Sequence, residues 1–168
     1  MELARFPTHL RLVRPADRDG AVSMPAERRL LSRRELLHRL DAVAELAPRA
    51  PLSFLAVRIE GLEEVEEERG EVGARFAARA VGDALAQVCR GTDLPGELEP
   101  GVFGVVLQGA GATAAAAAAA RLTHHLNRLR HLPAGCAVVV GAATGTGSHG
   151  RRLVGAALEM YESAGYEA

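Results

Sequence analysis

The stretch that most constrains the fold is residues 84–107, which read ALAQVCRGTDLPGELEPGVFGVVL. It predicts the end of a helix, a polar connection at residues 90–93, and then a β-hairpin. Pro100 and Gly101 stand between two extended runs and favour a turn, because Pro presets φ and Gly accepts positive φ. Residues 102–107 are β-branched and aromatic, as expected for a buried strand. The chain is therefore predicted to be organised around a helix that leads into a hairpin.

The segments on either side of this stretch alternate between helical and extended patterns. Residues 25–47 predict mostly helix, with Ser32 as its N-cap. The other expected elements are a strand at 52–60, a helix at 72–89, a helix at 113–132, a strand at 136–143 and a last helix at 151–164. The core face of the helix at 72–89 is expected to hold Phe76, Val81, Leu85 and Val88. The order strand–helix–strand–strand–helix–strand, with a final helix, favours an α/β domain in which helices pack on a sheet.

Size and composition are those of one globular domain with an attached segment. The chain has 168 residues, of which 48% are hydrophobic and 24% charged. Its net charge of −1 gives no support to nucleic-acid or anionic-membrane binding. Neither a signal peptide nor a membrane-spanning run is visible, so we expect a cytoplasmic protein. Cys89 and Cys136 stand in apolar surroundings and are expected to remain thiols.

Residues 1–24 are interpreted as an N-terminal extension or linker, and residues 25–168 as the domain. The extension holds one short extended candidate at residues 8–13, followed by turn-forming residues at 15–20. It either packs on the domain or joins two copies, and the sequence leaves both roles open.

Three local patterns suggest ligand sites but have simpler interpretations. The acidic run at residues 63–71 is typical of a solvated helix face and connection. His124 and His125 point to different faces of a helix, and His131 is seven residues after His124, so we expect no metal site. Residues 145–150 spell G-x-G-x-x-G, but only 18 residues follow, too few to complete a βαβ unit. We predict a flexible loop there.

The central stretch resembles a GGDEF domain, the family of cyclases that synthesise cyclic-di-GMP. In that family an R-x-x-D inhibitory site precedes the signature hairpin G-G-[DE]-E-F, and here Arg90 and Asp93 fall on the inhibitory site. The signature positions read Glu99, Pro100, Gly101, Val102 and Phe103. The resemblance runs without a gap from about residue 25 to residue 107. It implies an α/β fold of the nucleotidyl-cyclase, ferredoxin-like palm type, with a central, mainly antiparallel sheet flanked by helices.

The resemblance also implies that the catalytic positions are altered. The changed positions are Arg58 at the metal, Glu66 and Arg75 at the guanine, and Ala164 at the phosphate. A guanidinium stays protonated and only donates, so Arg58 is no metal ligand. Gly101 and Val102 replace the acidic residues of the signature. We therefore expect no cyclase activity, no bound metal and no cofactor.

Arg90 and Asp93 have the chemistry to bind a guanine nucleotide. The planar fork of Arg can bond guanine O6 and N7 or a phosphate, and a carboxylate can accept from guanine N1–H and N2–H₂. In the resembling family this pair binds an intercalated cyclic-di-GMP dimer, often with an Arg from a second protomer. The simpler alternative is an exposed ion pair at a helix end. Arg33 and Arg34 are either further ligand or interface contacts or a solvated basic helix start.

The combined hypothesis is a catalytically inactive GGDEF-like domain that acts as a cyclic-di-GMP receptor and signals to an unidentified protein partner. A homodimer is compatible with it, whereas nucleic-acid binding and membrane insertion are not expected. The alternative is a nucleotide-independent interaction or dimerisation scaffold. The two differ in whether Arg90 and Asp93 lie together, exposed, and unpaired by other protein groups.

Overall fold

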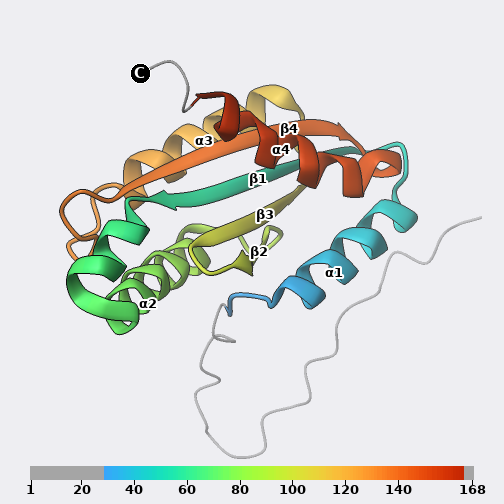
Figure 1. Cartoon of the computed structure of the whole chain (residues 1–168). Helices are drawn as coiled ribbons and strands as arrows, with labels where there is room; N and C mark the ends of the chain where they lie inside the picture. The colour runs from blue at the N-terminus through green and yellow to red at the C-terminus, as the bar shows by residue number, and fades with distance from the viewer. Residues whose placement is uncertain (1–28, 165–168) are drawn as a thin grey trace, which may run out of the picture.

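The computed structural model describes residues 29–164, so the extension expected at residues 1–24 lies outside the described residues. Figure 1 shows the elements in chain order. They are α1 (Arg33–Leu46), β1 (Pro51–Glu60), α2 (Leu62–Val88), β2 (Leu94–Glu99), β3 (Val102–Gln108), α3 (Ala112–Leu126), β4 (Ala137–Thr146), the 3-10 turn η1 (Gly147–His149) and α4 (Gly150–Ala164). This order confirms the predicted sequence of strands and helices.

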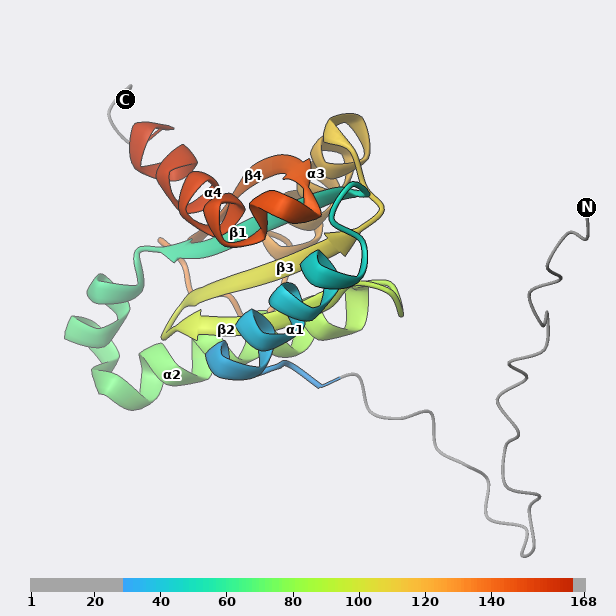
Figure 2. The same ribbon diagram turned by 90° about the vertical axis from the view of Figure 1, so that its right-hand side faces the viewer.

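The described strands form one sheet in the order β2-β3-β1-β4, and every pair is antiparallel. Helices α1 and α4 cover one face of the sheet, and α2 and α3 cover the other (Figure 2). The expected α/β fold, an antiparallel sheet flanked by helices, is therefore confirmed. The buried helix residues on the first face are Leu36, Leu40, Leu153 and Ala157, and those on the second include Val81, Leu85, Ala115, Leu122 and Leu126.

Strand β1 is apolar on both sides because helices cover both faces of the sheet. Phe54 and Ala56 face α1 and α4, whereas Leu55 and Val57 face α2 and α3. On β3, a Cβ added at Gly104 would lie 2.4 Å from Cζ of Phe54. Gly104 is therefore required where the aromatic ring crosses the neighbouring strand.

The start of α1 has the cap that the sequence predicts. The N–H of Ser32 donates to Oε2 of Glu35 at 2.9 Å, and Oγ of Ser32 accepts from the N–H of Glu35, which completes a capping box. The preceding residue, Leu31, donates its N–H to the Pro95 carbonyl at 2.9 Å and accepts from Glu97 N–H at 2.8 Å. The entry to α1 is therefore held against the edge strand β2.

Helix α2 differs from the prediction in two respects. The acidic run and the following helix are continuous, with a kink at Gly70 (φ 71°, ψ 172°) instead of a connection. Phe76, predicted to face the core, is 61% exposed and meets His131 edge-on, with ring centroids 6.1 Å apart. The smaller Ala77 and Ala78 occupy the core positions in this turn of the helix.

The second half of the chain brings two further corrections. Helix α3 ends at Leu126 and not at residue 132, because the Asn127 side chain bonds both the N–H and the carbonyl of Val138 at 2.8 Å. The loop predicted at residues 145–150 is instead the end of β4, the η1 turn and the first residue of α4. A Cβ at Gly147 would lie 2.5 Å from the Ala47 carbonyl oxygen, so this segment is packed closely.

Two further features concern the cysteines and the apolar character of the helices. Cys89 is buried, Cys136 is half-buried, and both are free thiols as predicted. Within residues 29–164 no helix combines the length and the apolar character needed to cross a membrane.

Candidate functional site

The turn between α2 and β2 carries Arg90 and Asp93. The backbone N–H of Arg90 donates to Oδ2 of Asp93 at 2.8 Å, and the N–H of Asp93 donates to the Arg90 carbonyl at 3.1 Å. These reciprocal bonds close the turn, as Asp side chains commonly do where a helix has ended. Buried Cys89 precedes the turn and anchors it to the core. Both side chains are thereby presented from one short, fixed segment.

The two side chains of this turn differ in their hydrogen bonding to the rest of the described protein. Arg90 is exposed and Asp93 half-buried. Asp93 bonds the backbone of Arg90 and not its guanidinium, so the simple ion pair considered from the sequence is not what holds the turn. Among residues 29–164, no hydrogen bond or ion pair involves the Arg90 guanidinium.

A hollow of about 190 Å³ lies beside this turn, and two more arginines line it. Arg39 comes from α1, and Arg29 comes from the segment before α1. Arg29 Nη2 lies 2.9 Å from Oε1 of Glu35. The Ser32 N–H and hydroxyl, with a smaller contribution from Arg29, lower the pKa of Glu35 and keep it ionised.

Sequence reasoning missed Arg29 and Arg39. Arg39 adjoins the buried Leu40 on α1, which places it at the border of the helix's core face. However, its position next to the start of β2 arises from the packing of α1 on the edge strand. No spacing in the sequence encodes that contact.

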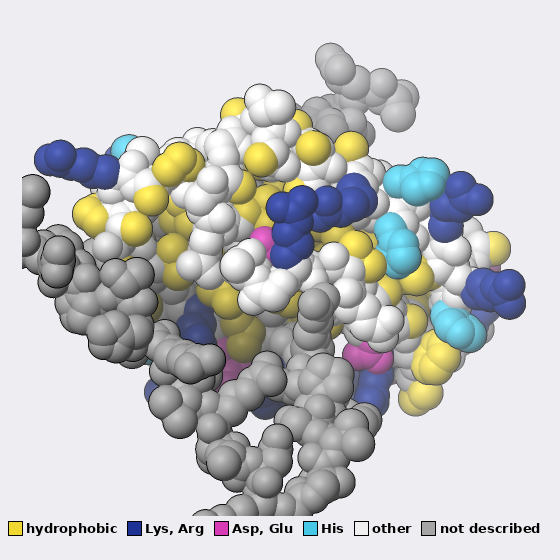
Figure 3. All heavy atoms as spheres, turned by 180° about the vertical axis from the view of Figure 1, so that it is seen from behind, with side chains coloured by type: hydrophobic (Ala, Val, Ile, Leu, Met, Phe, Trp, Pro, Cys, Tyr) yellow, Lys and Arg dark blue, Asp and Glu magenta, His cyan; other side chains and the backbone are white. Residues whose placement is uncertain are grey.

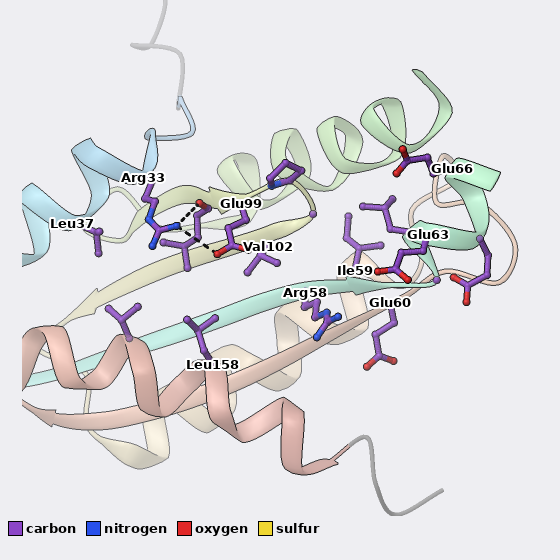
Figure 4. Close-up of a pocket in the computed structure, with 17 residues that line it drawn as sticks. Arg33, Leu37, Arg58, Ile59, Glu60, Glu63, Glu66, Glu99, Val102 and Leu158 are labelled. Carbon is purple, nitrogen blue, oxygen red and sulfur yellow. Dashed lines mark hydrogen bonds and ion pairs between the residues drawn. The ribbon is translucent and has the colours of Figure 1, made fainter. Parts of the chain in front are cut away.

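A larger cavity, about 980 Å³, opens at the other end of β2. It lies between the hairpin tip, the end of β1, the first turns of α1 and α2, and the middle of α4 (Figure 4). Arg33 points from α1 toward the hairpin, and its Nη1 lies 3.5 Å from both the Leu98 carbonyl oxygen and Oε1 of Glu99. Arg34 is exposed and does not line the cavity. Neither Arg33 nor Arg34 lines the hollow at Arg90.

The hairpin tip places the signature positions around this cavity. Pro100 and Gly101 form the turn, and Gly101 has φ 79°. Val102 is paired across the strands with Arg58, so an apolar side chain and a cation adjoin on the cavity side of the sheet. Phe103 points to the opposite face and is buried at 1% exposure.

The candidate metal positions do not form a cluster. Within the described part of the chain, no group of three or more His, Cys, Asp or Glu side chains is placed to hold a metal ion. The carboxylates of Glu60, Glu63 and Glu99 line the large cavity together with Arg58 (Figure 4). His124, His125 and His131 are all exposed, and Figure 3 shows histidines among arginines on the surface seen from behind.

A third depression, about 780 Å³, runs along α2. Glu66 and Arg75, the positions that the resemblance assigns to guanine binding, both line it. Arg75 Nε lies 3.7 Å from Oε1 of Glu71 one helical turn away. Val72 and Phe76 line the same depression. We call it the α2 groove.

An ion pair joins the two helices that wall the large cavity. Nε of Arg151 on α4 donates to Oδ1 of Asp41 on α1 at 2.7 Å, and its Nη2 contacts Oδ2. The hydrogen bonds from Arg151 lower the pKa of Asp41, and Asp41 in turn raises the pKa of Arg151. At the opposite end of β1 and β4, Cys136 donates to the Gly61 carbonyl, and burial raises the pKa of its thiol.

Comparison with known proteins finds similar structures and no similar sequence. No family model matches the chain, and no curated protein matches it. The GGDEF domain of FimX from Pseudomonas aeruginosa superposes with a TM-score of 0.73 at 16% identity, over 88% of this chain and 96% of that one.

Two further matches were solved as complexes. The GGDEF domain of DgcB from Caulobacter crescentus, in complex with c-di-GMP, matches with a TM-score of 0.68 at 15% identity, over 86% of this chain and 95% of that one. The diguanylate cyclase SiaD from Pseudomonas aeruginosa, in complex with its activator SiaC, matches with a TM-score of 0.73 at 19% identity, over 81% of this chain and 55% of that one. The chain therefore has the fold of GGDEF domains.

Proposed function

We propose that this chain is a GGDEF-fold domain without cyclase activity that binds cyclic-di-GMP through Arg90 and Asp93 and signals to a protein partner. The observation that carries the proposal is the turn before β2. It presents an exposed guanidinium with no partner among residues 29–164 next to a carboxylate fixed by the backbone.

The surroundings of this turn suit a ligand with two guanines and two phosphates. The Arg90 fork can bond O6 and N7 of one guanine, and the oxygens of Asp93 can accept from the guanine N–H groups. Arg39 and Arg29 line the same hollow and can meet phosphate or stack on a base. The GGDEF domain of DgcB, which has the same fold, was solved in complex with c-di-GMP, and this supports the proposal.

The large cavity supports the absence of cyclase activity. Phosphoryl transfer to form a cyclic dinucleotide needs metal ions held by carboxylates. Here a guanidinium, Arg58, and an apolar side chain, Val102, adjoin at the hairpin end of the sheet. A fixed positive charge at that place opposes a divalent cation.

Incubation of the purified chain with GTP and Mg²⁺ tests this part of the proposal. We expect no cyclic-di-GMP among the products, with an active diguanylate cyclase as the positive control. Turnover above the level of a heat-inactivated sample would contradict it.

A second candidate function is a nucleotide-independent protein-interaction scaffold. It is favoured because Arg29, one of the arginines that line the hollow, already pairs with Glu35 and is therefore less available to a nucleotide. The SiaD–SiaC complex shows that a protein containing this fold can be crystallised with a protein partner.

Isothermal titration of the purified chain with cyclic-di-GMP distinguishes the two candidates, with GTP and cyclic-di-AMP as controls. The receptor proposal expects a dissociation constant of about 1 μM or lower, equivalent to about −8 kcal/mol, and more than one ligand per chain. No heat with cyclic-di-GMP, together with no thermal shift, would remove the receptor and leave the scaffold.

A further inference from the structure

The α2 groove is an apolar depression on the surface. Phe76 is 61% exposed and Val72 is 75% exposed, and both line it. Leu62 and the buried Phe103 also contribute to its walls. Single exposed apolar residues are common, but a cluster around a hollow is typical of a contact surface.

The rim of this groove has an excess of negative charge. Arg75 is 3.7 Å from Glu71, and Arg79 is 3.8 Å from Asp83, so these four charges form two ion pairs. Two further carboxylates line the groove, Glu66 and Glu97, and neither has an ion pair with any residue between 29 and 164. An occupant that complements the groove is therefore apolar and cationic.

The chain enters the described structure beside this groove. Leu31 is bonded to β2 through both its N–H and its carbonyl. Leu30, the residue before it, lines the groove, and a Cβ added at Gly82 would lie 3.0 Å from Cδ2 of Leu30 and 3.1 Å from Cε1 of Phe103. The described part of the chain therefore begins within one residue of the groove.

The preceding sequence contains one segment of the required chemistry. Residues 5–14 read RFPTHLRLVR, with three arginines, no carboxylate, and apolar side chains at Phe6, Leu10, Leu12 and Val13. Residues 15–29 join this segment to the groove, and 15 residues reach at most about 50 Å. Helix α2, with 27 residues, is about 40 Å long, so the segment can reach every part of the groove.

We propose that residues 5–14 dock in the α2 groove of their own chain. The apolar side chains cover Val72 and Phe76, and the arginines meet Glu66 and Glu97. A short covalent tether favours this contact because it gives the segment a high effective concentration at the groove. The proposal is independent of ligand binding at Arg90, so a titration with cyclic-di-GMP neither supports nor contradicts it.

Hydrogen–deuterium exchange of the 168-residue chain tests the docking. We expect amide exchange in residues 6–14 to be at least tenfold slower than in the same peptide free in solution. The double variant Val72→Arg/Phe76→Arg removes two apolar contacts and adds two positive charges that repel the arginines of the segment, so it is expected to abolish this protection while exchange in β1 stays unchanged. The matched control is Leu46→Arg, at an apolar residue that is 86% exposed on α1, which should keep the protection.

Three results would overturn the proposal. The first is exchange of residues 6–14 at the rate of the free peptide in the unaltered chain. The second is protection that persists in the groove variant with β1 intact. The third is protection that develops only as the protein concentration rises and a dimer forms, which would assign the groove to a second copy.

A variant that reverses two charges of the segment tests its pairing with the acidic rim separately from the apolar contacts. Arg11→Glu/Arg14→Glu leaves every described residue unaltered. We expect it to reduce the protection of the segment at least fivefold at low salt. Unchanged protection would contradict the pairing of these arginines with Glu66 and Glu97.

Discussion

The charged side chains at the two ends of strand β2 differ in whether they have partners within the described residues. At the start, the Arg90 guanidinium has no partner among the described residues, and Asp93 bonds only backbone. At the end, Glu99 lies 3.5 Å from Arg33. Both ends adjoin a concave surface, a hollow of about 190 Å³ at the start and a cavity of about 980 Å³ at the end.

This difference indicates which end is prepared for a ligand. Cavity size alone would favour the hairpin end. A charged ligand gains little from groups that already neutralise one another, and it gains most from a cation held near a fixed carboxylate with no competing side chain. The smaller site at Arg90 is therefore the better candidate for a nucleotide.

Removal of the cation at the start of β2 should have the largest effect. We expect Arg90→Ala to weaken cyclic-di-GMP binding about 100-fold, because a bidentate contact from Arg to guanine contributes about 1–3 kcal/mol. Arg33→Ala, at the opposite end of the strand, is the matched control and should leave the affinity unchanged. Isothermal titration of both variants makes the measurement, and equal losses would remove the distinction between the ends.

The next largest effect should arise in the core between the two ends. A Cβ at Gly104 would overlap the ring of Phe54, so Gly104→Ala should reduce the free energy of unfolding by about 1–3 kcal/mol. The control is Gly91→Ala, whose added Cβ meets no atom within 4 Å. Urea denaturation compares them. A Gly104 variant as stable as the Gly91 variant would contradict the close packing of β1 and β3.

A smaller effect is expected at the pair that joins α1 to α4. Because Arg151 lowers the pKa of Asp41, the ionised carboxylate stabilises the fold above its ordinary pKa of 3.8. This contribution is lost as the pH falls through the lowered value. Asp41→Asn should therefore reduce the free energy of unfolding by at most about 1 kcal/mol at pH 7, since both side chains are partly exposed.

Denaturation at pH 7 and in steps below pH 3.8 makes this measurement, with Glu45→Gln on the same helix as the control. The difference between Asp41→Asn and the unaltered chain should shrink toward zero as the pH falls below that value. A difference that grows on acidification has the wrong sign for a lowered pKa.

The smallest effect is expected at the hairpin end. Arg33 and Glu99 are 61% and 64% exposed, and their closest atoms are 3.5 Å apart. Glu99→Gln should change the free energy of unfolding by no more than about 0.5 kcal/mol and leave ligand affinity unaltered. Chemical denaturation and titration of this variant check both values. A marked loss of ligand affinity would place the ligand at the large cavity.

The sequence predicted the elements with strong local signals. The Pro100–Gly101 turn, the Ser32 cap and the apolar run of β1 each depend on residues that are close in the chain. The helical spacing predicts Phe76 in the core, but it is 61% exposed, and Ala77 and Ala78 form the core face in that turn of α2. The end of α3 was missed because the Asn127 side chain stops the helix through a bond to a different element.

In the candidate site, too, some residues are brought together by their spacing in the sequence and others by tertiary packing. Arg90 and Asp93 belong to one turn, so their proximity could be predicted from their spacing. Arg29 and Arg39 reach the same hollow only through the packing of α1 on the edge of β2. The pairing of Arg33 with Glu99 joins residues 66 positions apart and likewise has no local signal.

Mapping of amide chemical shifts during titration with cyclic-di-GMP tests the central claim most directly. We expect the largest changes to cluster at residues 90–95, with smaller ones near Arg29 and Arg39, while residues 58–66 and the hairpin tip stay unchanged. Changes that cluster at the large cavity, or no changes at saturating ligand, would contradict it.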